Sequence, residues 1–209
     1  MDLLDATDAG AGLLRCGWPG TTADYVRYHD TEWGVPVQGD AAYFERLTFE
    51  AFQSGLSWLI VMRKREGFRR AFADFDPATV AGFSDADVAR LLADPGIIRN
   101  RQKVLATITN ARALRALQDA EGEGALMRIM DAHRPAEADL MREGFRRPPR
   151  ALGDLPTAVA ASHALTKALK RRGFVFVGPT TLYAGMQANG LVDDHLEGCF
   201  RRGSCVERM

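Results

Sequence analysis

The two ends of the chain carry four candidate metal ligands, and this constrains the fold more than any other feature of the sequence. Cys16 and His29 lie near the start, and His195 and Cys199 lie near the end. Two cysteines and two histidines make a complete tetrahedral ligand set for zinc. His195 and Cys199 are four positions apart, so on a helix they would share one face and reach the same ion. A metal held by all four would require one domain whose ends meet.

The same residues also allow simpler interpretations. A chain with three cysteines and four histidines can offer four ligands by chance, and this set lacks the compact spacing of a zinc finger. Cys205 could replace Cys199 as a ligand or remain a free thiol. A disulfide is disfavoured because the first 14 residues carry three aspartates and no basic residue, unlike a signal peptide. We therefore expect a cytoplasmic protein with reduced thiols.

Length and composition fit one compact domain. The chain has 209 residues, of which 46% are hydrophobic and 26% charged, and its formal net charge is zero. No apolar run is long enough to cross a membrane. We expect an acidic, disordered extension at 1–14, a single helical domain at 15–199 and a C-terminal tail at 200–209.

Hydrophobic periodicity and capping signals predict an all-α fold. Asp40 is placed to cap a helix that ends at Gly55, and further helices are predicted to begin at Pro77 and after Ser84. The later elements are a basic helix at 164–172 ended by Gly173, a helix at 180–189 ended by Gly190, and one strand-like run at 174–177. The proline-containing segment 146–154 is predicted to cross the surface between helices.

Basic residues gather in two stretches despite the zero net charge. Residues 99–115 hold five basic and no acidic residues, and residues 142–172 hold eight basic and two acidic residues. This distribution indicates a face that binds phosphates, although solvated helix faces would give the same pattern. The first stretch follows a break at 94–98, where a tight helix-hairpin-helix would expose backbone N–H groups to a DNA phosphate. An ordinary αα-hairpin is equally compatible with these residues.

Aromatic residues are concentrated in one part of the chain. All three tryptophans and three of the four tyrosines fall between residues 18 and 58, and of these Tyr43 is expected in the core. Such a concentration favours the wall of a site for a flat ligand over scattered core positions. Glu50 lies at the end of a predicted helix, where the helix dipole does not favour a carboxylate. Aromatic faces and a carboxylate together suit a flat cation.

These segments resemble the DNA-3-methyladenine glycosylase I family. The similar motifs are RCGW at 15–18, YHD at 28–30, EWGVP at 32–36, QSGLSW at 53–58, GIIR at 96–99, NAR at 110–112, RGF at 172–174, VG at 177–178, and MQA at 186–188 together with the residues that follow it through His195. They occur in the family's order and spacing from about residue 15 to residue 199. Pro179 departs from the pattern, because threonine is expected there.

The resemblance implies a helix-hairpin-helix DNA glycosylase fold in which a structural zinc joins the N- and C-terminal segments. It assigns the zinc to Cys16, His29, His195 and Cys199, and the base pocket to Trp18, Tyr25, Tyr28, Trp33, Glu50 and Trp58. It implies a monomer that flips 3-methyladenine out of double-stranded DNA and hydrolyses its N-glycosidic bond. The products would be free 3-methyladenine and an abasic site, with no membrane involved.

Within this interpretation, Trp58 is expected to stack on the flipped base, and Glu50 is the expected catalytic residue, accepting hydrogen bonds from the amino edge. The family lacks the catalytic aspartate of most relatives, and Thr107, Thr109 and Asn110 follow the hairpin instead. No lysine is expected to form a Schiff base, so no strand cleavage is expected.

The expected DNA contacts are Leu56, Gly96, Ile98, Arg99, Lys103, Lys167, Lys170 and Arg172. Leu56 would fill the gap left by the flipped base, and a buried leucine at a turn is the alternative. Two other classes of protein stay open at this point. One is a nucleobase binder without catalysis, and the other is a zinc hydrolase, which four protein ligands disfavour because they leave no position for water.

Overall fold

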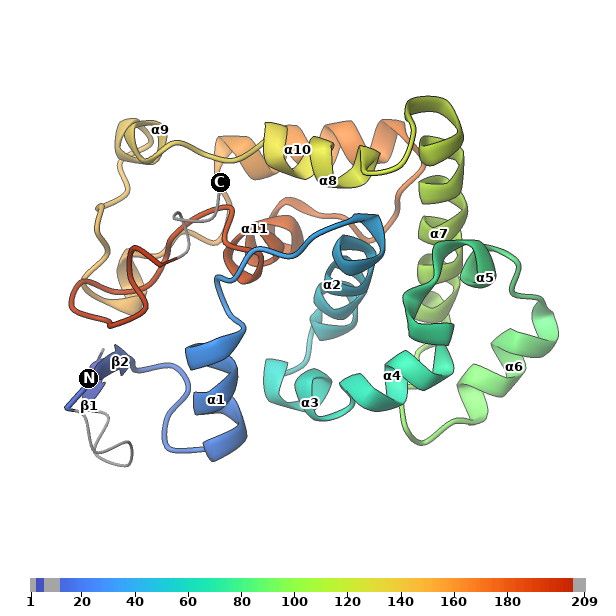
Figure 1. The fold of residues 1–209 in the computed structure, drawn as a ribbon, viewed down its shortest axis with the longest axis horizontal. Coiled ribbons are helices and arrows are strands. Elements are labelled where there is room, and N and C mark those ends of the chain that lie inside the picture. Colours follow the sequence, from blue (N-terminus) through green and yellow to red (C-terminus); the bar gives the residue numbers. More distant parts are fainter. Residues whose placement is uncertain (1–2, 6–11, 205–209) are drawn as a thin grey trace.

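The computed structural model describes residues 3–5 and 12–204, and these form a mostly helical domain (Figure 1). The helices are α1 (Ala23–Thr31), α2 (Asp40–Gln53), α3 (Trp58–Arg63), α4 (Arg65–Ala71), α5 (Pro77–Ala81), α6 (Asp85–Ala93), α7 (Arg101–Glu121), α8 (Ala125–Ala132), α9 (Glu137–Arg142), α10 (Ala160–Arg171) and α11 (Pro179–Ala188), with short 3₁₀ turns η2 (Ala73–Phe75) and η3 (Leu152–Asp154). None of the helices in this described part has the length and hydrophobicity of a membrane span.

Two short strands lie where the sequence predicted none. β1 (Leu3–Asp5) pairs antiparallel with β2 (Leu14–Cys16), and this pairing gives backbone partners to the segment that ends in Cys16. Part of the extension that we expected to be disordered is therefore a strand, while residues 1–2 and 6–11 lie outside the described residues.

The strand predicted at 174–177 does not form. The side-chain amide of Asn110 bonds both backbone groups of Val175, donating to its O at 3.0 Å and accepting from its N at 2.8 Å. These are the groups that a neighbouring strand would have used. Phe174 and Val177 are buried and the two residues between them are exposed, which explains why this loop has the composition of a strand.

The core is built around α2, which lies in the middle of the molecule with α11 and α7 on either side (Figure 1). Phenylalanine rings of α2 meet those of α4 and η2. Phe52 lies edge-on to Phe68 at 4.6 Å between ring centroids, and Phe49 lies edge-on to Phe75 at 5.3 Å. This aromatic packing fixes α2, and with it Glu50, against the centre of the domain.

Several helices begin or end with the capping residues that the sequence predicted. Asp76 Oδ2 accepts from the Thr79 backbone N at 2.7 Å at the start of α5. Ser84 and Asp87 form the predicted capping box at the start of α6. Gly55 adopts φ +80° just after α2, which is the left-handed conformation that ends many helices.

Asp40 does not cap α2, because it is the first residue of that helix and Gly39 precedes it. Its buried carboxylate instead accepts from the backbone N of Gly124 and of Met127, both at 3.0 Å, and so caps the start of α8. A capping residue for one helix was thus mistaken for the cap of another, because the sequence does not show which helix end lies near the carboxylate.

The predicted hairpin joins α6 to α7 across residues 94–100. Asp94 Oδ1 accepts from the Gly96 N at 2.6 Å, and Asn100 Oδ1 caps α7 by accepting from the Lys103 N at 3.1 Å. The turn packs backbone to backbone against α4, since a Cβ atom on Gly67 would lie 2.3 Å from the Gly96 carbonyl oxygen. Only glycine fits at position 67 without a shift of the hairpin.

Candidate functional site

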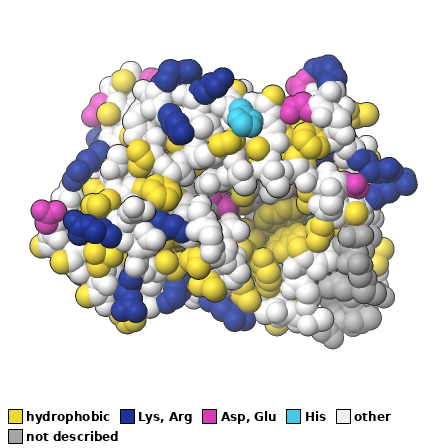
Figure 2. Space-filling model, turned by 180° about the vertical axis from the view of Figure 1, so that it is seen from behind, with side chains coloured by type: hydrophobic (Ala, Val, Ile, Leu, Met, Phe, Trp, Pro, Cys, Tyr) yellow, Lys and Arg dark blue, Asp and Glu magenta, His cyan; other side chains and the backbone are white. Residues whose placement is uncertain are grey.

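A cavity of about 250 Å³ opens between α1, α2, α3 and α11. It is lined by Trp18, Tyr25, Tyr28, Trp33, Glu50, Gln53, Trp58, Leu152, Leu155, Ala184 and Gln187. All six residues that the sequence suggested for a base pocket are among them. Figure 2 shows the back of the molecule, where one hollow is lined mainly by hydrophobic side chains.

The aromatic walls support one another through edge contacts. The Trp18 ring lies 5.0 Å from that of Tyr25 and 5.2 Å from that of Trp33, both edge-on, and Tyr28 lies 5.3 Å from Trp58. These contacts hold the rings of the cavity wall in fixed orientations. The indole N–H groups of Trp18 and Trp58 are buried, and neither has an acceptor among the described residues.

Among the described residues, Glu50 is the only carboxylate that lines this cavity. Its side chain comes from the last turn of α2, is 5% exposed, and receives no hydrogen bond within the described part of the chain. Burial raises its pKa to about 8, and the positive charge of Arg46 opposes this shift. A cation bound beside Glu50 would favour the charged carboxylate and lower its pKa again.

Five lining residues were missed by the sequence analysis. Gln53 follows Glu50 on α2, and Ala184 and Gln187 lie three residues apart on α11. Leu152 lies in the segment 146–154 that was predicted only to cross the surface, and Leu155 directly follows it. A glutamine or a leucine on an amphipathic element carries no signal that separates a pocket wall from ordinary packing.

The four candidate metal ligands meet in one buried cluster. Cys16 Sγ and Cys199 Sγ lie 3.7 and 3.6 Å from His195 Nδ1, and Cys199 Sγ lies 3.5 Å from His29 Nε2. All four ligand atoms lie within 4.8 Å of one another. A tetrahedral zinc with ordinary bond lengths separates a sulfur ligand from a nitrogen ligand by about 3.6 Å. The residues therefore fit such an ion without rearrangement.

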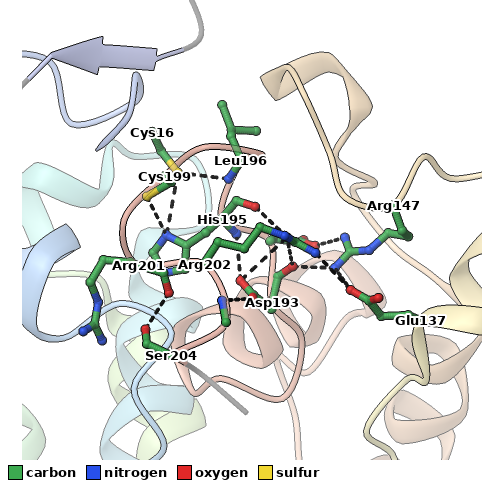
Figure 3. A network of polar contacts seen from close by, with 12 residues as sticks. Cys16, Glu137, Arg147, Asp193, His195, Leu196, Cys199, Arg201, Arg202 and Ser204 are labelled. Carbon is green, nitrogen blue, oxygen red and sulfur yellow. Dashed lines mark hydrogen bonds and ion pairs between the residues drawn. The ribbon is translucent and has the colours of Figure 1, made fainter. Parts of the chain in front are cut away.

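Further contacts hold the ligands in place. His29 Nδ1 lies 2.8 Å from Asp30 Oδ1, and Arg15 in turn holds that carboxylate with bonds of 2.7 and 2.9 Å. A carboxylate behind a histidine fixes its ring for metal binding. His195 and Cys199 do not share a helix, because both lie in the turns that follow α11. Figure 3 shows His195 and Cys199 converging on Cys16, with Arg202 of the C-terminal tail donating to the backbone of this loop.

Lys103 differs from its expected role as a phosphate contact. It is buried, and its Nζ donates to the backbone carbonyls of Phe52 at 2.8 Å and Ser54 at 2.6 Å. It thus satisfies the carbonyls at the end of α2, and burial lowers its pKa. The sequence showed a positive charge on the second hairpin helix but not that its tip would turn inward.

The other expected DNA contacts are available at the surface to different degrees. Arg99, Lys167 and Lys170 are exposed, Leu56 is 40% exposed, and Gly96 and Ile98 of the hairpin are half-buried. Arg172 is partly occupied, because it pairs with Glu121 at 3.1 Å. Leu56 is therefore an exposed residue in the loop between α2 and α3, and the alternative of a buried leucine is not supported.

The mostly helical fold agrees with the comparisons with known proteins. The sequence matches the methyladenine glycosylase family over residues 18–202, and the chain belongs to this family.

Similar proteins cover nearly the whole chain. DNA-3-methyladenine glycosylase 1 of Escherichia coli is 45% identical over 188 residues, 90% of this chain and 96% of that protein. A crystal structure of 3-methyladenine DNA glycosylase I superposes with a TM-score of 0.80 at 42% identity, covering 90% of this chain and 99% of the other. A tyrosine-to-phenylalanine variant of 3-methyladenine DNA glycosylase I, solved in complex with 3-methyladenine, superposes with a TM-score of 0.78 at 30% identity, covering 90% and 97%.

Proposed function

We propose that this chain is a monofunctional DNA glycosylase that removes 3-methyladenine from alkylated double-stranded DNA. It would flip the lesion into the cavity, hydrolyse the N-glycosidic bond and leave an abasic site. The observation that carries this proposal is the pairing of an aromatic cavity with one buried carboxylate, Glu50, that has no hydrogen-bond donor among the described residues. Its support from relatives is the family match and the similarity to proteins named for this activity.

The chemistry of the lesion fits this cavity. Methylation at N3 gives the adenine ring a positive charge, so the base leaves as a neutral molecule and needs little catalytic assistance. Trp58 would stack on the flipped base, while Glu50 would accept hydrogen bonds from the amino edge. Undamaged adenine is neutral, so it gains less from Glu50 and is bound more firmly to its sugar. Selectivity would therefore come mainly from recognition in the pocket, with Glu50 as the residue that contacts the reacting base.

The ligand cluster would hold a structural zinc. Cys16 and His29 lie on either side of the segment that bears Trp18 and Tyr25, while His195 and Cys199 follow α11. A bound ion would supply folding stability by tying these two parts of the chain together. Four protein ligands leave no position for a reactive water, so we assign the chemistry to the cavity.

DNA would bind across the hairpin and the loop that carries Leu56. Gly96, Ile98 and Arg99 would meet the backbone phosphates, Leu56 would fill the gap left by the flipped base, and Lys167, Lys170 and Arg172 would add charge. Lys103 is engaged with two carbonyls, so its amine is not free to form a Schiff base, and we expect no strand cleavage. We propose a monomeric enzyme that works in the cytoplasm.

The decisive experiment is incubation of the protein with methylated DNA, followed by chromatography of the released bases. Release of 3-methyladenine alone supports the proposal, and release of 7-methylguanine in similar yield would indicate a broader glycosylase. Binding of free 3-methyladenine without release of any base would show a nucleobase binder and contradict the proposed activity.

A further inference from the structure

Gln187 lies in the wall of the cavity and was not assigned a role by the sequence. α11 turns Ala184 and Gln187 toward the cavity, and Gln187 Nε2 donates to Asp194 Oδ2 at 2.7 Å. A glutamine amide has a donor end and an acceptor end, so its usefulness to a ligand depends on which end faces the cavity.

Asp194 determines that orientation. Its side chain is fully buried, Tyr183 Oη donates to Oδ2 at 2.7 Å, and Arg147 donates to Oδ1. Arg147 also pairs with Glu137 and donates to the backbone of Asp193, within the network of Figure 3. Both oxygens of this carboxylate accept hydrogen bonds, Oδ1 from Arg147 and Oδ2 from Tyr183 and Gln187. The Gln187 amide must therefore present its nitrogen to Asp194.

The amide oxygen of Gln187 is consequently the free end. It receives no hydrogen bond from any described residue, and it is not among the fully buried unpartnered atoms. Because Gln187 lines the cavity, this oxygen is an acceptor that a bound molecule can reach. Gln53 and the tyrosine hydroxyls of the lining can also accept a hydrogen bond, but among the described lining residues Gln187 is the neutral acceptor whose orientation an internal hydrogen bond fixes. Glu50 becomes a charged acceptor when a bound cation lowers its pKa.

We propose that Gln187 is a specificity-determining residue that accepts a hydrogen bond from the 6-amino group of the bound purine, and that Asp194 is its positioning residue. This inference rests on the proposed function and names how its site reads the base. A 6-amino group has two N–H donors, which can pair with the Glu50 carboxylate and the Gln187 oxygen. A 6-oxo purine would place an acceptor against acceptors and leave the buried groups unpaired, so guanine-type lesions would be disfavoured.

The test combines two variants that each remove one donor to the same atom, Asp194 Oδ2. Gln187→Met removes the amide from a side chain that lines the cavity, and Tyr183→Phe removes the hydroxyl of a side chain that does not line it. Binding of free 3-methyladenine is compared with binding of 3-methylpurine, which lacks only the amino group. Calorimetric titration of both bases into wild type and each variant gives the coupling between side chain and amino group.

We expect Gln187→Met to weaken binding of 3-methyladenine about tenfold and to leave binding of 3-methylpurine nearly unchanged. Tyr183→Phe should leave the ratio of the two affinities at the wild-type value. Equal weakening of both bases by Gln187→Met, or the same change in ratio in both variants, would mean that the residue serves only the internal network and would overturn the inference.

Asp194→Asn tests the positioning role. The asparagine can donate, so the Gln187 amide can turn over and lose its fixed orientation, and we expect the affinity ratio to fall as in Gln187→Met. A variant that folds, as judged by its melting temperature, and keeps the wild-type ratio would refute that role. Should it not fold, the other two variants still decide the role of Gln187. Failure of wild type to release 3-methyladenine from DNA would instead refute the proposed function itself.

Discussion

The cavity and the metal-ligand cluster are built partly by the same helix, yet they differ in how their polar groups are used. α1 supplies Tyr25 and Tyr28 to the cavity and His29 to the cluster. In the cluster the ligand atoms converge on one point and are braced by Asp30. In the cavity, Glu50 has no hydrogen-bond donor among the described residues. Groups that satisfy one another give stability, and groups left without partners provide binding.

Removing the proposed structural metal should have the largest effect on folding stability. Cys199→Ser, or a chelator at neutral pH, should cost on the order of 10 kcal/mol of folding free energy if the ion is structural. Since that approaches the whole stability of a domain, we expect an unfolded or loosened protein in thermal denaturation. Metal content measured by mass spectrometry should fall in parallel. Cys205→Ser is the control, and loss of metal in that variant would move the ligand assignment to Cys205, which lies outside the described residues.

The second prediction concerns stability and Glu50. Because burial raises its pKa from the ordinary 4.5 to about 8, the folded protein holds a proton that the unfolded chain releases. Stability should therefore fall as pH rises from 4.5 to 8, by up to about 5 kcal/mol from this group. Glu50→Gln should remove this part of the slope. Urea denaturation of both proteins at about pH 5 and pH 8 measures it, and identical slopes would show that Glu50 is not the group responsible.

The third prediction concerns binding at the same residue. Glu50→Gln keeps the shape of the side chain but removes its charge, so excision of 3-methyladenine should fall about a hundredfold. Glu45→Gln is the matched control, because Glu45 lies on the same helix and pairs with Arg69 away from the cavity. Single-turnover excision from methylated DNA distinguishes the two variants. Unchanged excision by Glu50→Gln would contradict the assigned role.

The smallest expected effect distinguishes two lysines. One, like the ligand cluster, is engaged in internal contacts, and the other, like Glu50, has no internal hydrogen-bond partner for its side chain among the described residues. Lys103 is engaged internally, so Lys103→Met should lower stability by about 1–3 kcal/mol and leave the salt dependence of DNA binding unchanged. Lys170 is exposed, so Lys170→Met should reduce the slope of log affinity against log salt by about 0.9. Fluorescence anisotropy at several salt concentrations measures the slope. The opposite assignment of effects would show that DNA binding rearranges Lys103.

The sequence predicted best what depends on residue type and local spacing. Capping at Asp76 and Ser84, the hairpin at 94–98, and the sets of ligands and aromatic residues are all local or compositional signals. The family resemblance then placed the sets in one fold, and the family is confirmed.

The sequence failed where the answer depends on which distant atom lies near a side chain. Asp40 caps α8 through Gly124, which lies 84 residues later in the chain, and Lys103 reaches back to the end of α2. Gln187 shows the same limit, because its role depends on Asp194 and Arg147 holding its amide in one orientation. Charge and hydrophobicity are visible in a sequence, whereas the direction of a long side chain is set by packing.

The contact between Gly67 and Gly96 limits how far the hairpin can move relative to the core. Backbone touches backbone there, so the hairpin cannot slide over α4, and α4 packs through Phe68 on the helix that carries Glu50. This packing would fix the distance between the proposed phosphate-binding hairpin and the proposed base pocket. We expect the DNA to bend and the lesion to rotate out of the helix to match this fixed distance. The protein itself should rearrange little.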